Sequence, residues 1–208
     1  MKSFLSIKHD LTNEIVIEKS RFICTLKRVR NEDEAKSFVS SVKAKYPDAT
    51  HNCYAYIADE GAFFIKFSDD GEPQGTAGIP MLETLKNKGL KQVAVVVTRY
   101  FGGIKLGTGG LARAYADCVK RAIDLSGTVE NLYSCTLKTV VSYQLYPKIL
   151  KLLESEKAVK NSEDFINDGV EITFTIPVEK QTDIKDKILD YSSGKSSVLE
   201  IEKLYFEY

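Results

Sequence analysis

The stretch VVVTRYFGGIKLGTGGLARAY (residues 95–115) contains a strand, a glycine-rich loop and the start of a helix in succession. Its first part belongs to an uninterrupted apolar run, which predicts a strand over 92–100 that is buried on both faces. Five of the nine residues of 102–110 are glycines, and glycine allows positive φ angles and a close approach of the backbone to a ligand. Apolar residues at helical spacing then predict a helix over 111–126.

This glycine-rich loop is a candidate binding site for anions. The free N–H groups at a helix start carry partial positive charge, and three cations but no carboxylate occur between residues 98 and 116. A phosphate group is the natural partner of such a surface. The predicted phosphate- or nucleic-acid-binding residues are Arg99, Lys105, Gly107, Thr108, Gly109, Gly110 and Arg113.

A purely architectural interpretation of the same loop stays open. The loop does not match the nucleotide P-loop, which needs Gly-Lys-Ser/Thr where this chain has Gly-Thr-Gly at 107–109, and it fits the dinucleotide fingerprint poorly. The glycines could simply permit a tight crossover from strand to helix, with Arg113 paired to Asp117 on a solvated helix face.

A second loop, SDDGEPQGTAGIP (residues 68–80), concentrates three carboxylates in four positions. Asp69, Asp70 and Glu72 could hold Mg²⁺, which prefers oxygen ligands. Alternatively they could serve a tight turn, because Asp side chains bond nearby backbone amides. Thr76 could cap the helix that follows.

Two further pairs of residues have both a functional and a structural interpretation. His51 and Cys53 share one face of a predicted strand, where an imidazole could activate a thiol or could be a hydrogen-bonded histidine at a strand end. Tyr100 and Phe101 fit a base-stacking platform or the end of a core strand. The residues of a possible pocket are His51, Asp69, Asp70, Glu72 and Thr76, and no catalytic residue or metal ligand is assigned.

The remaining hydrophobic patterns predict an α+β protein of two domains. Before residue 92 they predict strands around 15–17 and over 21–29, followed by a helix that Asn31 caps and Pro47 ends. Two strands, over 52–58 and 62–67, are predicted to be joined by a turn at 59–61. A helix that includes Met81 and Leu85 follows. Later come a strand (135–143), a helix (146–157), strands (158–165 and 170–178), a helix (182–191) and a strand (198–206). This βαββαβ order is that of a ferredoxin-like domain, so we place the domains at 1–130 and 131–208.

Composition limits the classes of protein to consider. The 29 Lys and Arg residues balance 29 Asp and Glu residues, with +3 in residues 1–130 and −3 in the remainder, so total charge alone does not indicate nucleic-acid binding. The longest apolar run, Val93–Val97, is far shorter than the ~20 residues that span a bilayer, and no secretory signal is recognisable. The wide spacing of the four cysteines predicts buried, reduced thiols rather than a zinc site. We expect a soluble cytoplasmic protein without a cofactor or a membrane partner.

The two loops together resemble the signature of the YigZ/IMPACT family. Supporting matches are Lys-Ser-Arg-Phe at 19–22 and His-Asn-Cys-Tyr-Ala at 51–55, and the resemblance covers the whole chain. It implies a first domain with the β-α fold shared by RNase PH, a small-subunit ribosomal protein and the fourth domain of elongation factor G. It also implies a ferredoxin-like second domain similar to the fifth domain of that factor.

The resemblance further implies that eukaryotic relatives control translation by competing for an activator of the amino-acid-starvation kinase. They do so with an additional N-terminal domain that we do not expect here, so that role is not carried over. The sequence predicts a non-enzymatic RNA- or ribosome-associated protein, with regulation of translation and stress response as its setting. The alternatives are a metal-assisted enzyme acting on a small phosphorylated substrate and a protein-binding module that docks through the sheet of the second domain.

Overall fold

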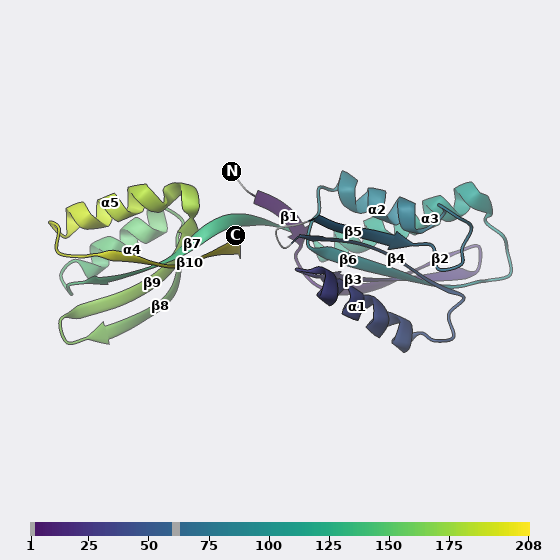
Figure 1. The fold of residues 1–208 in the computed structure, drawn as a ribbon, viewed down its shortest axis with the longest axis horizontal. Coiled ribbons are helices and arrows are strands. Elements are labelled where there is room, and N and C mark those ends of the chain that lie inside the picture. Colours follow the sequence, from purple (N-terminus) through teal and green to yellow (C-terminus); the bar gives the residue numbers. More distant parts are fainter. Residues whose placement is uncertain (1–2, 60–62) are drawn as a thin grey trace. The chain divides into compact units, whose positions relative to one another are not determined.

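The computed structural model describes residues 3–59 and 63–208 of the chain. Within these ranges the chain forms two compact units. The first unit is Phe4–Glu130, and the second unit is Asn131–Tyr208 together with Ser3. Both units combine antiparallel strand pairs with helices packed on a sheet, so the protein is of the mixed α+β class (Figure 1).

The sheet of the first unit has β6 (Val93–Tyr100) at its centre. Its five strands lie in the order β2-β3-β6-β4-β5, and every neighbouring pair is antiparallel. The other strands are β2 (Leu11–Ile17), β3 (Ser20–Arg28), β4 (His51–Asp59) and β5 (Phe63–Ser68). Residues 93–97 of β6 are fully buried, because helices cover both faces of the sheet. The prediction of a strand buried on both faces is confirmed.

Three helices cover this sheet. α1 (Glu32–Lys45) lies on one face, and α2 (Gly78–Asn87) and α3 (Gly107–Ser126) lie on the other (Figure 1). The Asn31 side chain accepts a hydrogen bond from the Glu34 amide at 2.9 Å, so it caps α1 as the sequence predicts. Two separate apolar clusters, one on each face, hold the three layers together.

The structure changes two expectations for this unit and leaves a third untested. α3 begins at Gly107 rather than at residue 111, because Gly109 and Gly110 of the loop belong to its first turn, which follows Gly107 with its positive φ of 69°. The chain also contains β1 (Ser3–Ile7), which is hydrogen-bonded to β7 (Thr128–Val141) and which the sequence patterns missed. Of the expected turn at 59–61, residues 60 and 61 lie outside the described part of the chain.

The second unit contributes four strands to a five-stranded sheet, whose fifth strand is β1, and two helices lie on one face of these four strands. Its elements are the later part of β7, α4 (Tyr146–Ser155), β8 (Val159–Ile166), β9 (Gly169–Pro177), a short 3₁₀ turn (Val178–Lys180), α5 (Gln181–Tyr191) and β10 (Val198–Glu207). The strand order is β10-β7-β9-β8, all antiparallel. Side chains of α4 and α5 pack with alternate residues of β7 and β9 in a single apolar cluster. β7 starts seven residues before the predicted strand, because it continues from the end of α3.

The structure also bears on the cysteines and on membrane-spanning segments. All four cysteines are free and buried, as predicted; they are Cys24, Cys53, Cys118 and Cys135. Across residues 3–59 and 63–208, no helix is both long enough and apolar enough to cross a bilayer.

Candidate functional site

The acidic loop at 68–80 meets β6 and α3 through the side chain of Glu72. The Arg99 guanidinium on β6 donates to Glu72 Oε1 at 2.6 Å, and the Tyr115 hydroxyl on α3 donates to the same oxygen at 2.8 Å. The Glu72 and Arg99 side chains are only 3% and 5% exposed. The structure therefore brings the two sequence motifs together around a buried ion pair.

His51 and Cys53 lie next to this pair on β4, and both are held by backbone carbonyls. His51 Nδ1 is 2.9 Å from the carbonyl oxygen of Asp70, and its Nε2 is 3.8 Å from Glu72 Oε2. The Cys53 thiol donates to the carbonyl of Asp69 at 2.9 Å. Burial raises the pKa of Cys53 to about 12, so the thiol is protonated at neutral pH. This environment favours a structural cysteine over a nucleophile.

Asp69 caps α2 from a distance in the sequence. Its carboxylate accepts hydrogen bonds from the amides of Gly75, Ala77 and Gly78 at 2.8, 3.0 and 2.8 Å. Burial acts to raise the pKa of Asp69, but the three amide bonds lower it, and the net shift is below the ordinary value. The expectation that Thr76 caps this helix is wrong: its hydroxyl donates to the carbonyl of Pro73 at 2.6 Å instead.

Asp70 is also fully engaged by protein groups. Its carboxylate accepts from Lys43 Nζ at 2.6 Å and from the amide of Asn52 at 2.7 Å. The carboxylates of Asp69, Asp70 and Glu72 thus bind three different sets of partners and do not converge. In the part of the chain that the structure describes, no group of three or more His, Cys, Asp or Glu side chains could hold a metal ion. The tight-turn interpretation of this loop fits these contacts.

The predicted phosphate-binding residues divide into a buried one and exposed ones. Arg99 is inside the unit, where its guanidinium lies over the rings of Phe22 and Phe101 at 5.3 and 5.4 Å from the ring centroids. Its Nη2 donates to Ser20 Oγ at 3.3 Å, whereas its buried Nε has no partner among the described residues. Arg99 therefore positions the loop rather than facing solvent.

The other predicted residues lie at the exposed start of α3. Gly107, Thr108, Gly109 and Gly110 form its first turn, which has no side-chain cap and no acidic residue. Lys105 and Arg113 are exposed. Arg113 Nε donates to the Gly109 carbonyl at 3.2 Å, so its guanidinium lies against this turn. Within the described ranges no ion pair joins Arg113 to Asp117, contrary to the architectural alternative.

A third cation, which the sequence reasoning did not single out, lies beside this loop. Lys19 is in the two-residue turn between β2 and β3, and its backbone packs against Gly102 so closely that a Cβ atom on Gly102 would be 2.0 Å from the Lys19 carbonyl carbon. The amide of Gly102 donates to Ser20 Oγ at 3.1 Å. The sequence contained one signal of this contact, a glycine two residues after the end of β6, but a glycine alone does not indicate which segment packs against it.

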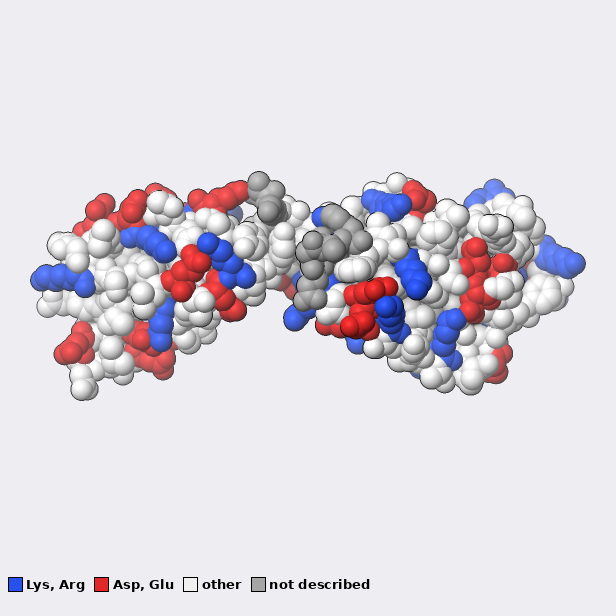
Figure 2. Space-filling view, in the orientation of Figure 1, with Lys and Arg blue, Asp and Glu red and all other residues white. Residues whose placement is uncertain are grey.

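Lys19, Lys105 and Arg113 form what we call the basic rim. All three side chains are exposed, and none pairs with a carboxylate among the residues that the structure describes. Basic side chains are visible at the end of the first unit where the β6–α3 connection lies, whereas acidic and basic side chains are mixed elsewhere on the displayed face (Figure 2). These three exposed cations belong to a protein with no net charge.

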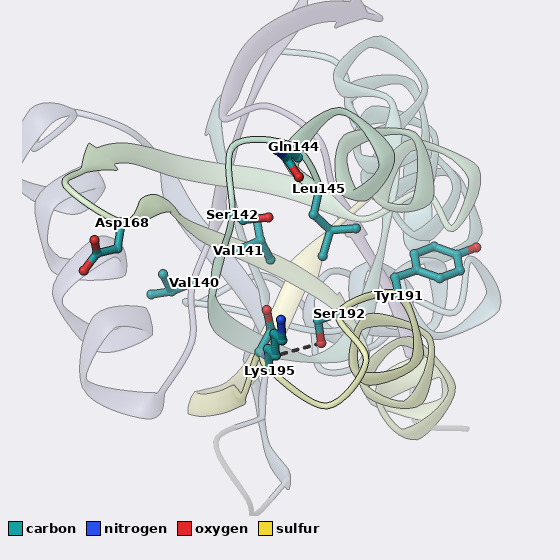
Figure 3. Close-up of a pocket in the computed structure, with 10 residues that line it drawn as sticks. Val140, Val141, Ser142, Gln144, Leu145, Asp168, Tyr191, Ser192 and Lys195 are labelled. Carbon is teal, nitrogen blue, oxygen red and sulfur yellow. Dashed lines mark hydrogen bonds between the residues drawn. The ribbon is translucent and has the colours of Figure 1, made fainter.

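The second unit contains a pocket of about 450 Å³ that the sequence did not predict. It is lined by the end of β7, the β7–α4 and α5–β10 connections and the β8–β9 turn (Figure 3). Figure 3 shows the Asp168 carboxylate and the Tyr191 hydroxyl pointing away from the pocket. Ligand sites usually combine an apolar wall with converging polar groups, and two polar side chains of this pocket do not converge on it. We therefore assign no ligand to the pocket and place the candidate site at the basic rim.

The first unit defines the class of protein to which the chain belongs. Residues 18–123, which include the buried ion pair, the Asp69 cap and the basic rim, match the Impact N-terminal domain. The chain is a member of the IMPACT family.

Relatives of full length are found in bacteria, and shorter matches are found in eukaryotes. The chain is 42% identical to IMPACT family member YvyE of Bacillus subtilis, over 100% of this chain and 95% of the relative. It is 36% identical to IMPACT family member YigZ of Escherichia coli, over 98% of this chain and 100% of the relative. Protein IMPACT of Rattus norvegicus is 36% identical over 45% of this chain and 30% of its own length.

A solved structure is similar to this chain over nearly its full length. It is described as the crystal structure of an hypothetical protein, and it is similar with a TM-score of 0.61 and 37% sequence identity. The similarity covers 97% of this chain and 98% of that one.

Proposed function

We propose that this protein is a non-enzymatic, RNA- or ribosome-associated cytoplasmic factor in the regulation of translation, and that it binds RNA phosphates at the basic rim. The observation that carries the proposal is a set of three exposed cations. Lys105 precedes the uncapped start of α3, Arg113 lies on α3, and Lys19 is in the turn that packs on Gly102. Cations of this kind neutralise phosphates, and helix-start amides add directional donors to the phosphate oxygens.

The order of the two units along the chain supports the same proposal. We propose 1–130 and 131–208 as the two domains, the second of them ferredoxin-like because its strand order is β10-β7-β9-β8 with both connecting helices in one apolar cluster with the sheet. Together with a first domain like the fourth domain of elongation factor G, this order is that of a pair that contacts the ribosome. Fold analogy does not itself establish a function, so the proposal rests on the basic rim.

Fluorescence anisotropy with a labelled single-stranded RNA of 20 nucleotides tests the proposal directly. Each phosphate contact to single-stranded nucleic acid contributes roughly 0.7 to the slope of log affinity against log salt concentration. Replacing Lys19, Lys105 and Arg113 by Ala together is therefore expected to weaken binding at low salt and to reduce that slope by about 2.

A charge-matched variant serves as the control. Lys45, Lys151 and Lys195 are three other exposed cations, and their joint replacement by Ala changes the net charge by the same amount. We expect this control to retain most of the affinity and of the salt dependence. Equal losses of RNA affinity in the two triple variants would mean that the basic rim contributes only through the net charge of the protein. An unchanged affinity in the first triple variant would show that the basic rim does not bind RNA.

A further inference from the structure

Phe101 is an exposed aromatic side chain on a backbone that is held in place on both sides. The residue is 45% exposed. Its amide donates to Thr50 Oγ1 at 3.0 Å, and the next amide, of Gly102, donates to Ser20 Oγ at 3.1 Å. An exposed ring usually moves with its loop, whereas here hydrogen bonds to β3 and to the residue before β4 fix its position.

The ring itself rests on a buried cation. The Arg99 guanidinium lies 5.4 Å from the ring centroid, within the range of a cation–π contact. Arg99 is in turn held by Glu72 at 2.6 Å. The guanidinium lies against the ring, and the residue is still 45% exposed, so another flat group can reach the ring.

The surroundings of the ring favour a nucleic-acid base as that group. Phe101 immediately precedes Gly102, which packs on Lys19, and it is four residues before Lys105. An aromatic ring among cations is the combination by which proteins bind single strands, because the cations follow the phosphates while the ring stacks on a base. Paired bases in a duplex are already stacked on one another and are not accessible to a ring on a loop.

We infer that the ligand of the basic rim is single-stranded RNA, one base of which stacks on Phe101. The inference rests on the proposed function, because the cations of the basic rim supply the phosphate contacts. It adds a requirement that phosphate binding does not have, namely an unpaired base and an aromatic residue at 101.

The absence of tryptophan from the chain makes a direct measurement available. In a Phe101→Trp variant the single tryptophan reports on its own environment. We expect a single-stranded 12-nucleotide RNA to quench its fluorescence at saturation, and we expect a 12-base-pair RNA duplex and inorganic polyphosphate not to do so. Phe64→Trp is the matched control, because Phe64 is 40% exposed on β5, and its fluorescence is expected to stay unchanged with all three ligands.

Affinity provides the second measurement. A stacked base contributes enough that Phe101→Leu is expected to weaken binding of the single strand by about 5- to 150-fold, while Phe101→Trp retains the affinity. Binding of the duplex, which uses phosphate contacts alone, is expected to stay within about twofold of the wild type in both variants.

The outcomes separate the two proposals. If the basic-rim triple variant loses RNA binding while Phe101→Leu binds the single strand like the wild type, the base-stacking inference is overturned and phosphate binding stands. If Phe101→Leu loses affinity for single strand and duplex equally, the ring only supports the loop, and the inference again fails. If the basic-rim variant binds RNA unchanged, the proposed function itself falls.

Discussion

Glu72 and Arg99 are 27 positions apart in the sequence and form an ion pair of 2.6 Å inside the first unit. Their side chains are 3% and 5% exposed, so neither charge has an alternative partner in bulk water. The pair joins the acidic loop to the strand that leads into the glycine-rich loop, and the Tyr115 hydroxyl adds α3 to the same oxygen. One buried carboxylate thus joins the acidic loop, β6 and α3, the last two of which flank the glycine-rich loop.

Breaking this pair from one side is expected to be strongly destabilising. Glu72→Gln or Arg99→Met leaves the other charge buried without its partner, which costs about 3–5 kcal/mol of the free energy of unfolding. The double variant is expected to lose less than the two single variants together, because it leaves no uncompensated charge. Urea unfolding of the four proteins measures the coupling.

An exposed pair in the same unit provides the comparison. Arg21 donates to Glu14 at 2.9 Å, but both side chains are largely in solvent. Glu14→Gln is therefore expected to cost at most about 1 kcal/mol. Equal, small costs at Glu14 and Glu72 would mean that the buried pair does not hold the two loops together.

The cap that Asp69 provides for α2 is expected to give a pH-dependent contribution to stability. The folded-state pKa of Asp69 lies below its ordinary value of 3.8, since its three amide bonds outweigh the opposite effect of burial. A carboxyl with a lowered pKa stabilises the fold above its unfolded pKa, and that contribution is lost as the pH falls through the folded pKa.

The difference in unfolding free energy between the wild type and Asp69→Asn is thus expected to be about 1–3 kcal/mol at pH 7. It is expected to shrink below pH 3.8. Asp117→Asn, an exposed position on α3, is the control and is expected to show no such trend. A difference at Asp69 that stays constant from pH 7 to pH 3 would contradict the capping role.

The sequence predicted a strand over 92–100, found at 93–100, and the Asn31 cap, because both depend on neighbouring residues only. It did not predict which carboxylate faces Arg99, since that contact is made between segments that are far apart in the chain. Asp69 was recognised as a turn residue, but its acceptor role for Gly78 depends on how the loop closes. Lys19 was missed as a neighbour of the glycine-rich loop for the same reason. Local sequence patterns therefore identify the strands, the helix caps and the candidate site residues, whereas long-range contacts determine which of these residues are exposed.

The two glycines at 102 and 109 are expected to respond in opposite ways to Ala. A Cβ on Gly102 would lie 2.0 Å from a backbone carbon of Lys19, so Gly102→Ala must displace the β2–β3 turn, and overpacking of this kind costs about 1–3 kcal/mol. Gly109 has nothing within 4 Å of its Cβ position and lies in α3, where Ala is favoured over Gly by up to about 1 kcal/mol. Thermal unfolding of both variants measures the difference, and a Gly102→Ala variant as stable as the wild type would show that the turn is not fixed by this contact.

Lys19 offers a way to separate charge from stability at the basic rim. Its φ angle is +62° and that of Glu18 is +46°, a left-handed conformation in which glycine avoids a steric cost of roughly 1 kcal/mol. Lys19→Gly is therefore expected to leave the free energy of unfolding unchanged or to raise it by at most about 1 kcal/mol. The same variant is expected to bind RNA more weakly, with a salt slope smaller by roughly 0.7.

Glu18→Gly relieves the same turn but removes a negative charge, so its RNA affinity is expected to stay the same or rise. Opposite effects of the two variants on RNA affinity, at similar stability, would assign the Lys19 effect to its charge, whereas parallel losses would assign it to the shape of the turn and remove Lys19 from the phosphate contacts.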